Sequence, residues 1–103
     1  MNITHDQEQT RKGIIDILHE KNGYEYNLHK ASEELQELSL VLTQKLTKPH
    51  KVNDQEIIDE IGDVEIRLEI LKRIFNKDKI NKRIVDKLKK FQEYHDSDKY
   101  RYI

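Results

Sequence analysis

Hydrophobic residues recur at intervals of three and four along four segments of the chain, which is the spacing of one face of an α-helix. The clearest stripe consists of Leu28, Ala31, Leu35, Leu38 and Leu42. Three Gly and one Pro among 103 residues leave few positions that would interrupt a helix. The pattern therefore predicts an all-α protein. Its helices are expected at about residues 4–22, 27–47, 54–75 and 79–95.

Polar residues at the ends of these segments agree with the predicted boundaries. Thr4 is followed three residues later by Gln7, and Asn53 by Glu56, which is the spacing of a capping box. Pro49 stops the second helix. The short connections between the helices favour antiparallel neighbours. We therefore expect one domain over residues 1–103, folded as a four-helix, mostly antiparallel bundle.

The third segment is hydrophobic on two sides. One stripe consists of Ile57, Ile61, Val64, Leu68, Leu71 and Phe75, and the other of Ile66, Ile70 and Ile74. A helix of this kind is usually sandwiched between two neighbours. We expect the chain itself to cover one side and a partner chain to cover the other.

Charge and composition exclude several classes of function. The 19 basic and 20 acidic residues leave a net charge of -1, which gives no overall field toward nucleic acid or an anionic membrane. The absence of Cys excludes disulfides, Cys-based zinc sites and a cysteine nucleophile. No stretch is apolar enough to span a membrane, and the first residues do not resemble a signal peptide. We expect a soluble cytoplasmic protein that binds neither a nucleic-acid polymer nor a membrane.

Acidic residues form the one constellation that suggests chemistry. Glu34 and Glu37 lie three residues apart beside the Leu stripe of the second helix, and Glu60 and Asp63 are spaced in the same way on the third. If these helices pack antiparallel, the two pairs can face each other at the edge of the contact. Four carboxylates there would repel one another unless a cation neutralised them, and oxygen ligands suit magnesium. The alternative interpretation is a solvated acidic face, which is common in a chain with 38% charged residues.

Gly62 lies between Glu60 and Asp63 in the middle of the third helix. A glycine there costs about 1 kcal/mol of helix propensity relative to Ala. We expect something to need room beside it, such as a close helix or a ligand.

The two acidic segments, residues 30–38 and 59–71, together resemble the MazG-like all-α nucleoside triphosphate pyrophosphohydrolases. The family pattern is Glu-x-x-Glu on one helix and Glu-x-x-Asp on the next, and 22 residues separate Glu37 from Glu60 here. The resemblance covers about residues 27 to 91. It is greatest to the small single-domain proteins of this kind from phages and low-GC bacteria.

The resemblance implies an enzyme that cleaves a nucleoside triphosphate between the α- and β-phosphates and releases pyrophosphate. It implies that Glu34, Glu37, Glu60 and Asp63 bind Mg²⁺, or alternatively Mn²⁺, and that Glu34 also orients or deprotonates the attacking water. Members of the family build the site in a homodimer or homotetramer, which agrees with the two-sided third helix.

Five further residues are candidates for contact with the substrate: Asn27, Lys30, Arg83, Lys87 and Lys90. Relatives often carry Gln near the position of Asn27, so the shorter amide leaves the choice of substrate open. The cationic residues could bind phosphate, or they could form an ordinary solvated basic face.

Two other functions remain open at this point. One is a non-catalytic helical interaction module, in which the acidic pairs are solvated and the third helix binds a protein. The other is a nucleotide-binding regulator with the same fold and no turnover.

Overall fold

The computed structural model describes residues 4–96, which form helices and, within that range, no strand. The four α-helices and one 3-10 turn are α1 (His5–Asn22), α2 (Tyr24–Thr47), η1 (Pro49–Lys51), α3 (Asp54–Ile74) and α4 (Lys77–Asp96). The predicted all-α fold with four helices is therefore confirmed. The sequence placed the start of α2 three residues too late, because Gly23 alone, at a φ of 82°, separates the first two helices.

The capping box predicted at Thr4 is complete, and at Asn53 the side chain makes the first of the two hydrogen bonds of a capping box. The Thr4 hydroxyl accepts a hydrogen bond from the Gln7 backbone N–H at 3.2 Å, and the Gln7 side chain accepts one from the Thr4 N–H at 2.9 Å. At the start of α3, the Asn53 side chain accepts a hydrogen bond from the Glu56 N–H at 2.9 Å. Each cap satisfies backbone donors that a helix leaves unpaired at its first turn.

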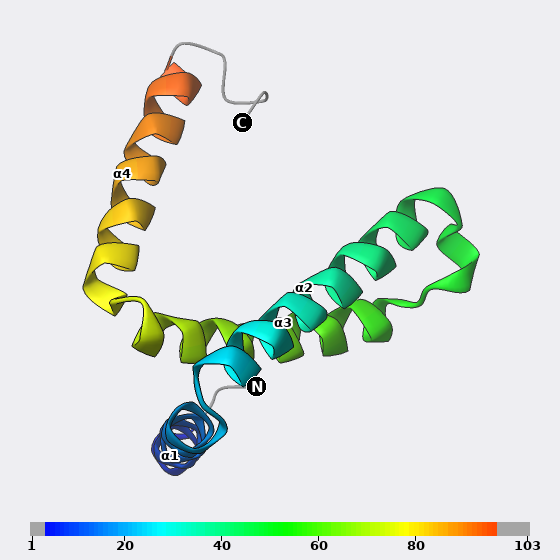
Figure 1. The fold of residues 1–103 in the computed structure, drawn as a ribbon. Coiled ribbons are helices and arrows are strands. Elements are labelled where there is room, and N and C mark those ends of the chain that lie inside the picture. Colours follow the sequence, from blue (N-terminus) through cyan, green and yellow to red (C-terminus); the bar gives the residue numbers. More distant parts are fainter. Residues whose placement is uncertain (1–3, 97–103) are drawn as a thin grey trace.

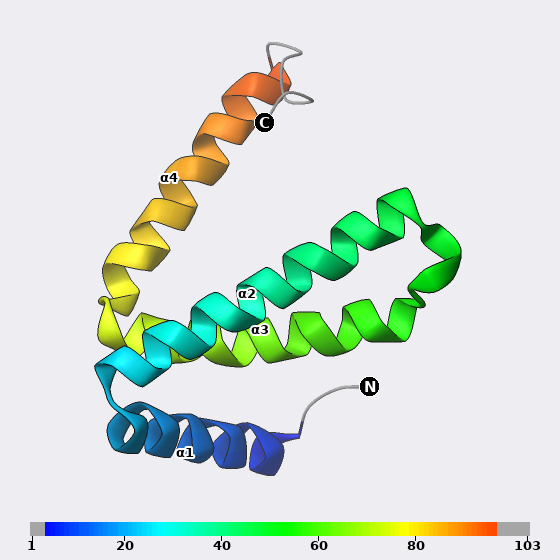
Figure 2. The same ribbon diagram turned by 45° about the vertical axis from the view of Figure 1, so that its right-hand side comes forward.

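Helices α2 and α3 run in opposite directions and are joined at one end by η1, while α1 packs across them near the other end (Figures 1 and 2). Four of the buried apolar residues lie on these helices, namely Ile15, Ala31, Val64 and Ile70, and a fifth, Val52, lies between η1 and α3. Tyr24 and Phe75 close the α1 end of the hairpin, with their rings edge to face at 6.1 Å between centroids. The hairpin with α1 is thus the structural unit that positions the acidic residues.

Both hydrophobic sides of α3 contact the chain itself. One side faces α2, and on the other side α1 contacts α3 and Ile70 is only 1% exposed. Helix α1 therefore covers part of the Ile66–Ile74 side, whereas Ile66 remains 39% exposed, and cover of the rest by a partner chain stays a prediction. Gly62, in contrast, has open space beside it: a Cβ atom there would meet no atom of the chain within 4 Å.

Helix α4 leaves the other three helices. After a turn in which Asn76 adopts a φ of 73°, α4 extends away from the hairpin, and among the described helices it contacts only α3 (Figures 1 and 2). Its hydrophobic stripe is largely uncovered, with Ile84 45% and Leu88 58% exposed. Within residues 4–96, three helices pack together and the fourth is left with an open apolar face.

None of the helices in the described part of the chain combines the length and the apolar character that crossing a membrane requires.

Candidate metal centre

The hairpin of α2 and α3 brings three of the four predicted carboxylates together. Glu34 and Glu37 lie one turn apart on α2, and Glu60 lies opposite them on α3. One oxygen from each of the three side chains lies within 4.8 Å of the others. We refer to Glu34, Glu37 and Glu60 as the acidic cluster.

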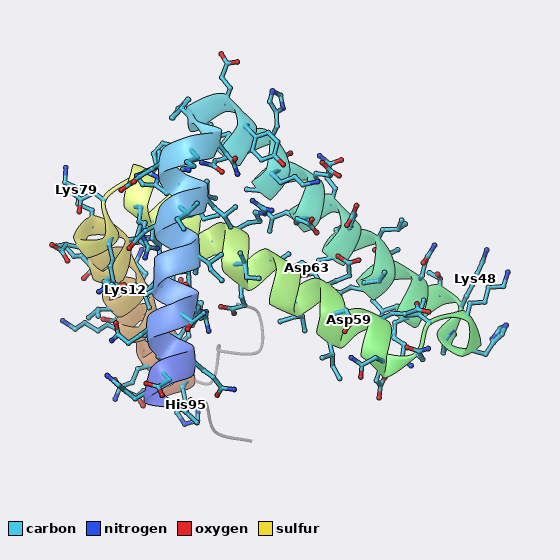
Figure 3. All side chains as sticks on the ribbon, turned by 90° about the horizontal axis from the view of Figure 1, so that it is seen from below. Lys12, Lys48, Asp59, Asp63, Lys79 and His95 are labelled. Atoms are coloured by element: carbon cyan, nitrogen blue, oxygen red, sulfur yellow. The ribbon has the colours of Figure 1, made fainter. Side chains whose placement is uncertain are left out.

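Asp63, the fourth predicted ligand, lies one turn after Glu60 on α3, the helix on which Figure 3 labels Asp59 and Asp63. It is not one of the three residues whose oxygens lie within 4.8 Å of one another. Its charge nevertheless reaches the cluster, because it raises the pKa of both Glu34 and Glu60. The structure therefore places Asp63 at the edge of the acidic cluster.

The environment of the cluster disfavours the charged form of its carboxyl groups. Burial is the largest cause that raises the pKa of Glu34 and of Glu60, and the negative charge of Glu37 is the second. The charge of Asp63 follows in both cases. Burial and neighbouring carboxylates act in the same direction here, because both penalise the ionised form.

The acidic cluster lacks protein partners of opposite charge. Among residues 4–96, no Lys or Arg forms an ion pair with Glu34, Glu37, Glu60 or Asp63. Glu34 and Glu60 each have an Oε2 atom that is buried and accepts no hydrogen bond. Buried carboxylate oxygens without a donor are costly, and a cation is one way to satisfy them.

The geometry of the cluster fits a divalent cation. Oxygens on opposite sides of one Mg²⁺ ion lie about 4.2 Å apart, since each Mg–O distance is about 2.1 Å. The spread of 4.8 Å in the cluster exceeds this value only slightly, so small rotations of the Glu side chains would bring all three oxygens onto one ion. The all-oxygen donor set suits Mg²⁺ or Mn²⁺ and not a soft metal.

The candidate substrate residues on α2 lie in different settings. Asn27 is 1% exposed, and its Nδ2 donates a hydrogen bond to the Leu18 carbonyl at 3.4 Å, so it packs at the junction of α1 and α2. Lys30 forms an ion pair with Glu33 at 3.4 Å on the surface of α2. The Asn27 Oδ1 atom is buried and accepts no hydrogen bond, and contact of this residue with a substrate stays a prediction.

The candidate residues on α4 lie away from the cluster of their own chain. Arg83, Lys87 and Lys90 belong to a helix that contacts only α3 and extends away from the hairpin (Figure 2). The Lys87 ammonium lies over the ring of Phe91, 5.4 Å from its centroid. The structure therefore does not bring these three cations to the acidic cluster of their own chain.

Sequence reasoning missed Arg67. It follows Asp63 by one turn on α3, and its Nη1 atom is buried without a hydrogen-bond partner. The interval of four residues from Asp63 is a signal that could have indicated it. A buried guanidinium nitrogen without a protein partner on the same helix as Glu60 and Asp63 is available to an anionic ligand.

Comparisons with protein families, with curated proteins and with solved structures found no match for this chain.

Proposed function

We propose that this protein is a magnesium-dependent nucleotide pyrophosphohydrolase of the MazG-like kind. The observation that carries the proposal is the acidic cluster, in which oxygens of Glu34, Glu37 and Glu60 lie within 4.8 Å of one another. The absence of ion pairs to these residues within residues 4–96 supports a cation as their missing partner.

In the proposed site, Glu34, Glu37 and Glu60 bind the metal, and Asp63, at the edge of the cluster, is the fourth ligand. A bound divalent cation offsets the charge of phosphate and makes water a better nucleophile. Glu34 orients the attacking water and accepts its proton, a role that suits a carboxyl group whose pKa is raised by burial and by Glu37. The substrate is a ribo- or deoxynucleoside triphosphate, and the products are a nucleoside monophosphate and pyrophosphate.

The proposal includes a homo-oligomer, a dimer or a tetramer, because the single chain is unusually open. It exposes 8524 Å² of surface, whereas a folded monomer of this mass exposes about 6,100 Å². Its radius of gyration is 16.9 Å, against about 13 Å for a compact domain of this length. The excess surface is of the size that obligate homodimers bury.

Helix α4 is the element that association would cover. Its exposed Ile84 and Leu88 would pack on apolar residues that the hairpin leaves open, such as Leu35 and Ile61, in a second copy. This arrangement would also bring basic residues of α4 toward an acidic cluster: Arg83, Lys87 and Lys90. We therefore propose that they bind phosphate across the interface.

The test of the reaction is release of pyrophosphate from a panel of ribo- and deoxynucleoside triphosphates with Mg²⁺, with Mn²⁺ and with EDTA. We expect turnover that EDTA abolishes and that Glu37→Gln or Asp63→Asn lowers by at least about a hundredfold, since removal of a metal ligand costs that much or more. Glu65→Gln is the matched control, because it makes the same charge change on α3 outside the cluster, and it should keep full activity.

Silence of the whole panel would refute the hydrolase proposal. If the nucleotides then still raised the melting temperature with Mg²⁺, the protein would be a nucleotide-binding regulator. Sedimentation of the wild type and of Leu88→Glu tests the oligomer. A monomeric wild type at micromolar concentration would contradict that part of the proposal.

A further inference from the structure

A second charged site lies where α1, the end of α3 and the start of α4 meet. It is a cleft of about 530 Å³. Five cationic side chains and three carboxylates line it: Arg11, Lys12, Lys72, Arg73, Lys77, Glu8, Asp16 and Glu69. We refer to this site as the basic cleft. Its charge balance is opposite to that of the acidic cluster.

Two ion pairs between helices fix the walls of the basic cleft. Arg11 of α1 pairs with Glu69 of α3, and the Arg73 Nε donates a hydrogen bond to Asp16 Oδ1 at 2.8 Å. Arg73 also donates from Nη1 to the Glu69 carbonyl at 3.3 Å. These pairs hold α1 against α3, and they account for both arginines of the cleft.

The three lysines of the cleft, unlike its two arginines, lack carboxylate partners among residues 4–96. Lys12, Lys72 and Lys77 come from α1, α3 and α4 respectively, and none of them forms an ion pair with another residue of the 4–96 range. Glu8 is the one carboxylate of the cleft outside the two ion pairs. Three lysines from three helices around one cleft, of which Lys12 and Lys77 are exposed, leave an excess of positive charge there.

The basic cleft is separate from the acidic cluster. Glu69 follows Glu60 by nine residues, which is two and a half turns, so the two side chains leave α3 on opposite sides. The acidic cluster faces α2, whereas the basic cleft faces α1 and the start of α4. A ligand of one site therefore does not occupy the other.

We propose that the basic cleft binds an oligophosphate anion, such as pyrophosphate or the polyphosphate chain of a nucleotide, without a metal ion. Three lysines need a partner with several negative charges, and an ammonium is a compact point charge that suits phosphate oxygens. A di- or triphosphate can contact lysines on separate helices at once, whereas a single carboxylate cannot. Because Lys77 stands at the start of α4 and Lys12 on α1, the bound anion links two helices that do not otherwise contact each other.

Calorimetric titration of the full chain with pyrophosphate, tripolyphosphate and ATP in the presence of EDTA tests this site. EDTA prevents metal-dependent binding at the acidic cluster, so failure of the proposed reaction and failure of this site are distinguishable. We expect saturable binding that weakens as salt is added. The double variant Lys12→Gln, Lys72→Gln should bind several-fold more weakly, by up to about twenty-fivefold, since each lost charge contact at a partly exposed site counts for up to about a factor of five.

The matched control is Lys48→Gln, Lys51→Gln, which makes the same charge change at η1. Figure 3 labels Lys12 and Lys48 at opposite ends of the molecule. The control should bind like the wild type, and Lys12→Arg, Lys72→Arg should restore most of the affinity. Equal binding by the two Gln double variants would overturn the proposal, as would a lack of binding by the wild type. Binding to an oligonucleotide without binding to tripolyphosphate would also overturn it, because it would indicate an extended surface for nucleic acid.

Discussion

The substitution Glu34→Gln should stabilise the protein when no metal is present. Glu34 loses its charge and keeps nearly its shape, so the repulsion from Glu37 disappears. Two unit charges 4.8 Å apart repel by about 0.9 kcal/mol even at the dielectric constant of water. Relief of this repulsion, together with the easier burial of a neutral amide, should add about 1 kcal/mol to the free energy of unfolding. In a domain of this size that corresponds to a rise of about 4–8 °C in the melting temperature.

The assay is thermal unfolding followed by circular dichroism in EDTA at pH 7. Glu33→Gln serves as the control, because it makes the same charge change one residue away, where Glu33 pairs favourably with Lys30. That variant should be no more stable than the wild type. With saturating Mg²⁺ the order should reverse, since the wild type gains stability from binding and Glu34→Gln gains less.

The stability gain should also depend on pH in a defined direction. The pKa of Glu34 is raised in the folded protein above its ordinary value of 4.5, so the folded state binds this proton more tightly than the unfolded state does. The stability of the metal-free wild type should therefore fall as the pH rises above that value. Below it both states are protonated, and the advantage of Glu34→Gln should vanish. A variant less stable than the wild type at pH 7 in EDTA would refute the reasoning.

Further predictions concern the packing of the hairpin and the open space beside α3. Ile70→Ala should lower the free energy of unfolding by about 2–5 kcal/mol, because Ile70 is 1% exposed. Ile58 is 57% exposed on α3, so the control Ile58→Ala should cost less than about 1 kcal/mol. Denaturation by urea measures both changes. Gly62→Ala and Gly13→Ala should each stabilise the protein by about 1 kcal/mol, since neither Cβ would meet an atom within 4 Å. A loss of stability in Gly62→Ala alone would show that another molecule approaches α3 at that point.

The helical fold and the acidic cluster were predictable because they depend on local spacing. Because Glu34 and Glu37 are three residues apart, they lie on the same side of α2 independently of how the other helices pack. The side of α3 that meets α2 follows from its hydrophobic stripe. The approach of Glu60 to the α2 pair then required only that the two helices form a hairpin, which the short connection at Pro49 favours.

The features that sequence reasoning missed depend on where α1 and α4 lie. Periodicity shows that Ile70 faces a neighbour, but it cannot tell α1 from a partner chain. The burial of Asn27 depends on the contact of α1 with α2, which the apolar pattern of α2 does not reveal. Lys12, Lys72 and Lys77 come from three helices and meet at the basic cleft only because those helices pack together. No spacing along the sequence could therefore have predicted the cleft.

The isolation of α4 has a consequence for how the protein opens. A single helix of 20 residues is marginal in water, because most helical stability in proteins comes from packing. The amide hydrogens of α4 should therefore exchange with solvent through local opening, well before those of α2 and α3, which open only with the core. If α4 is covered by a second copy, its exchange should slow as the protein concentration rises, while exchange in the hairpin core stays closer to constant. Amide exchange measured at two concentrations thus reports, helix by helix, which part of the fold one chain supplies and which part needs two.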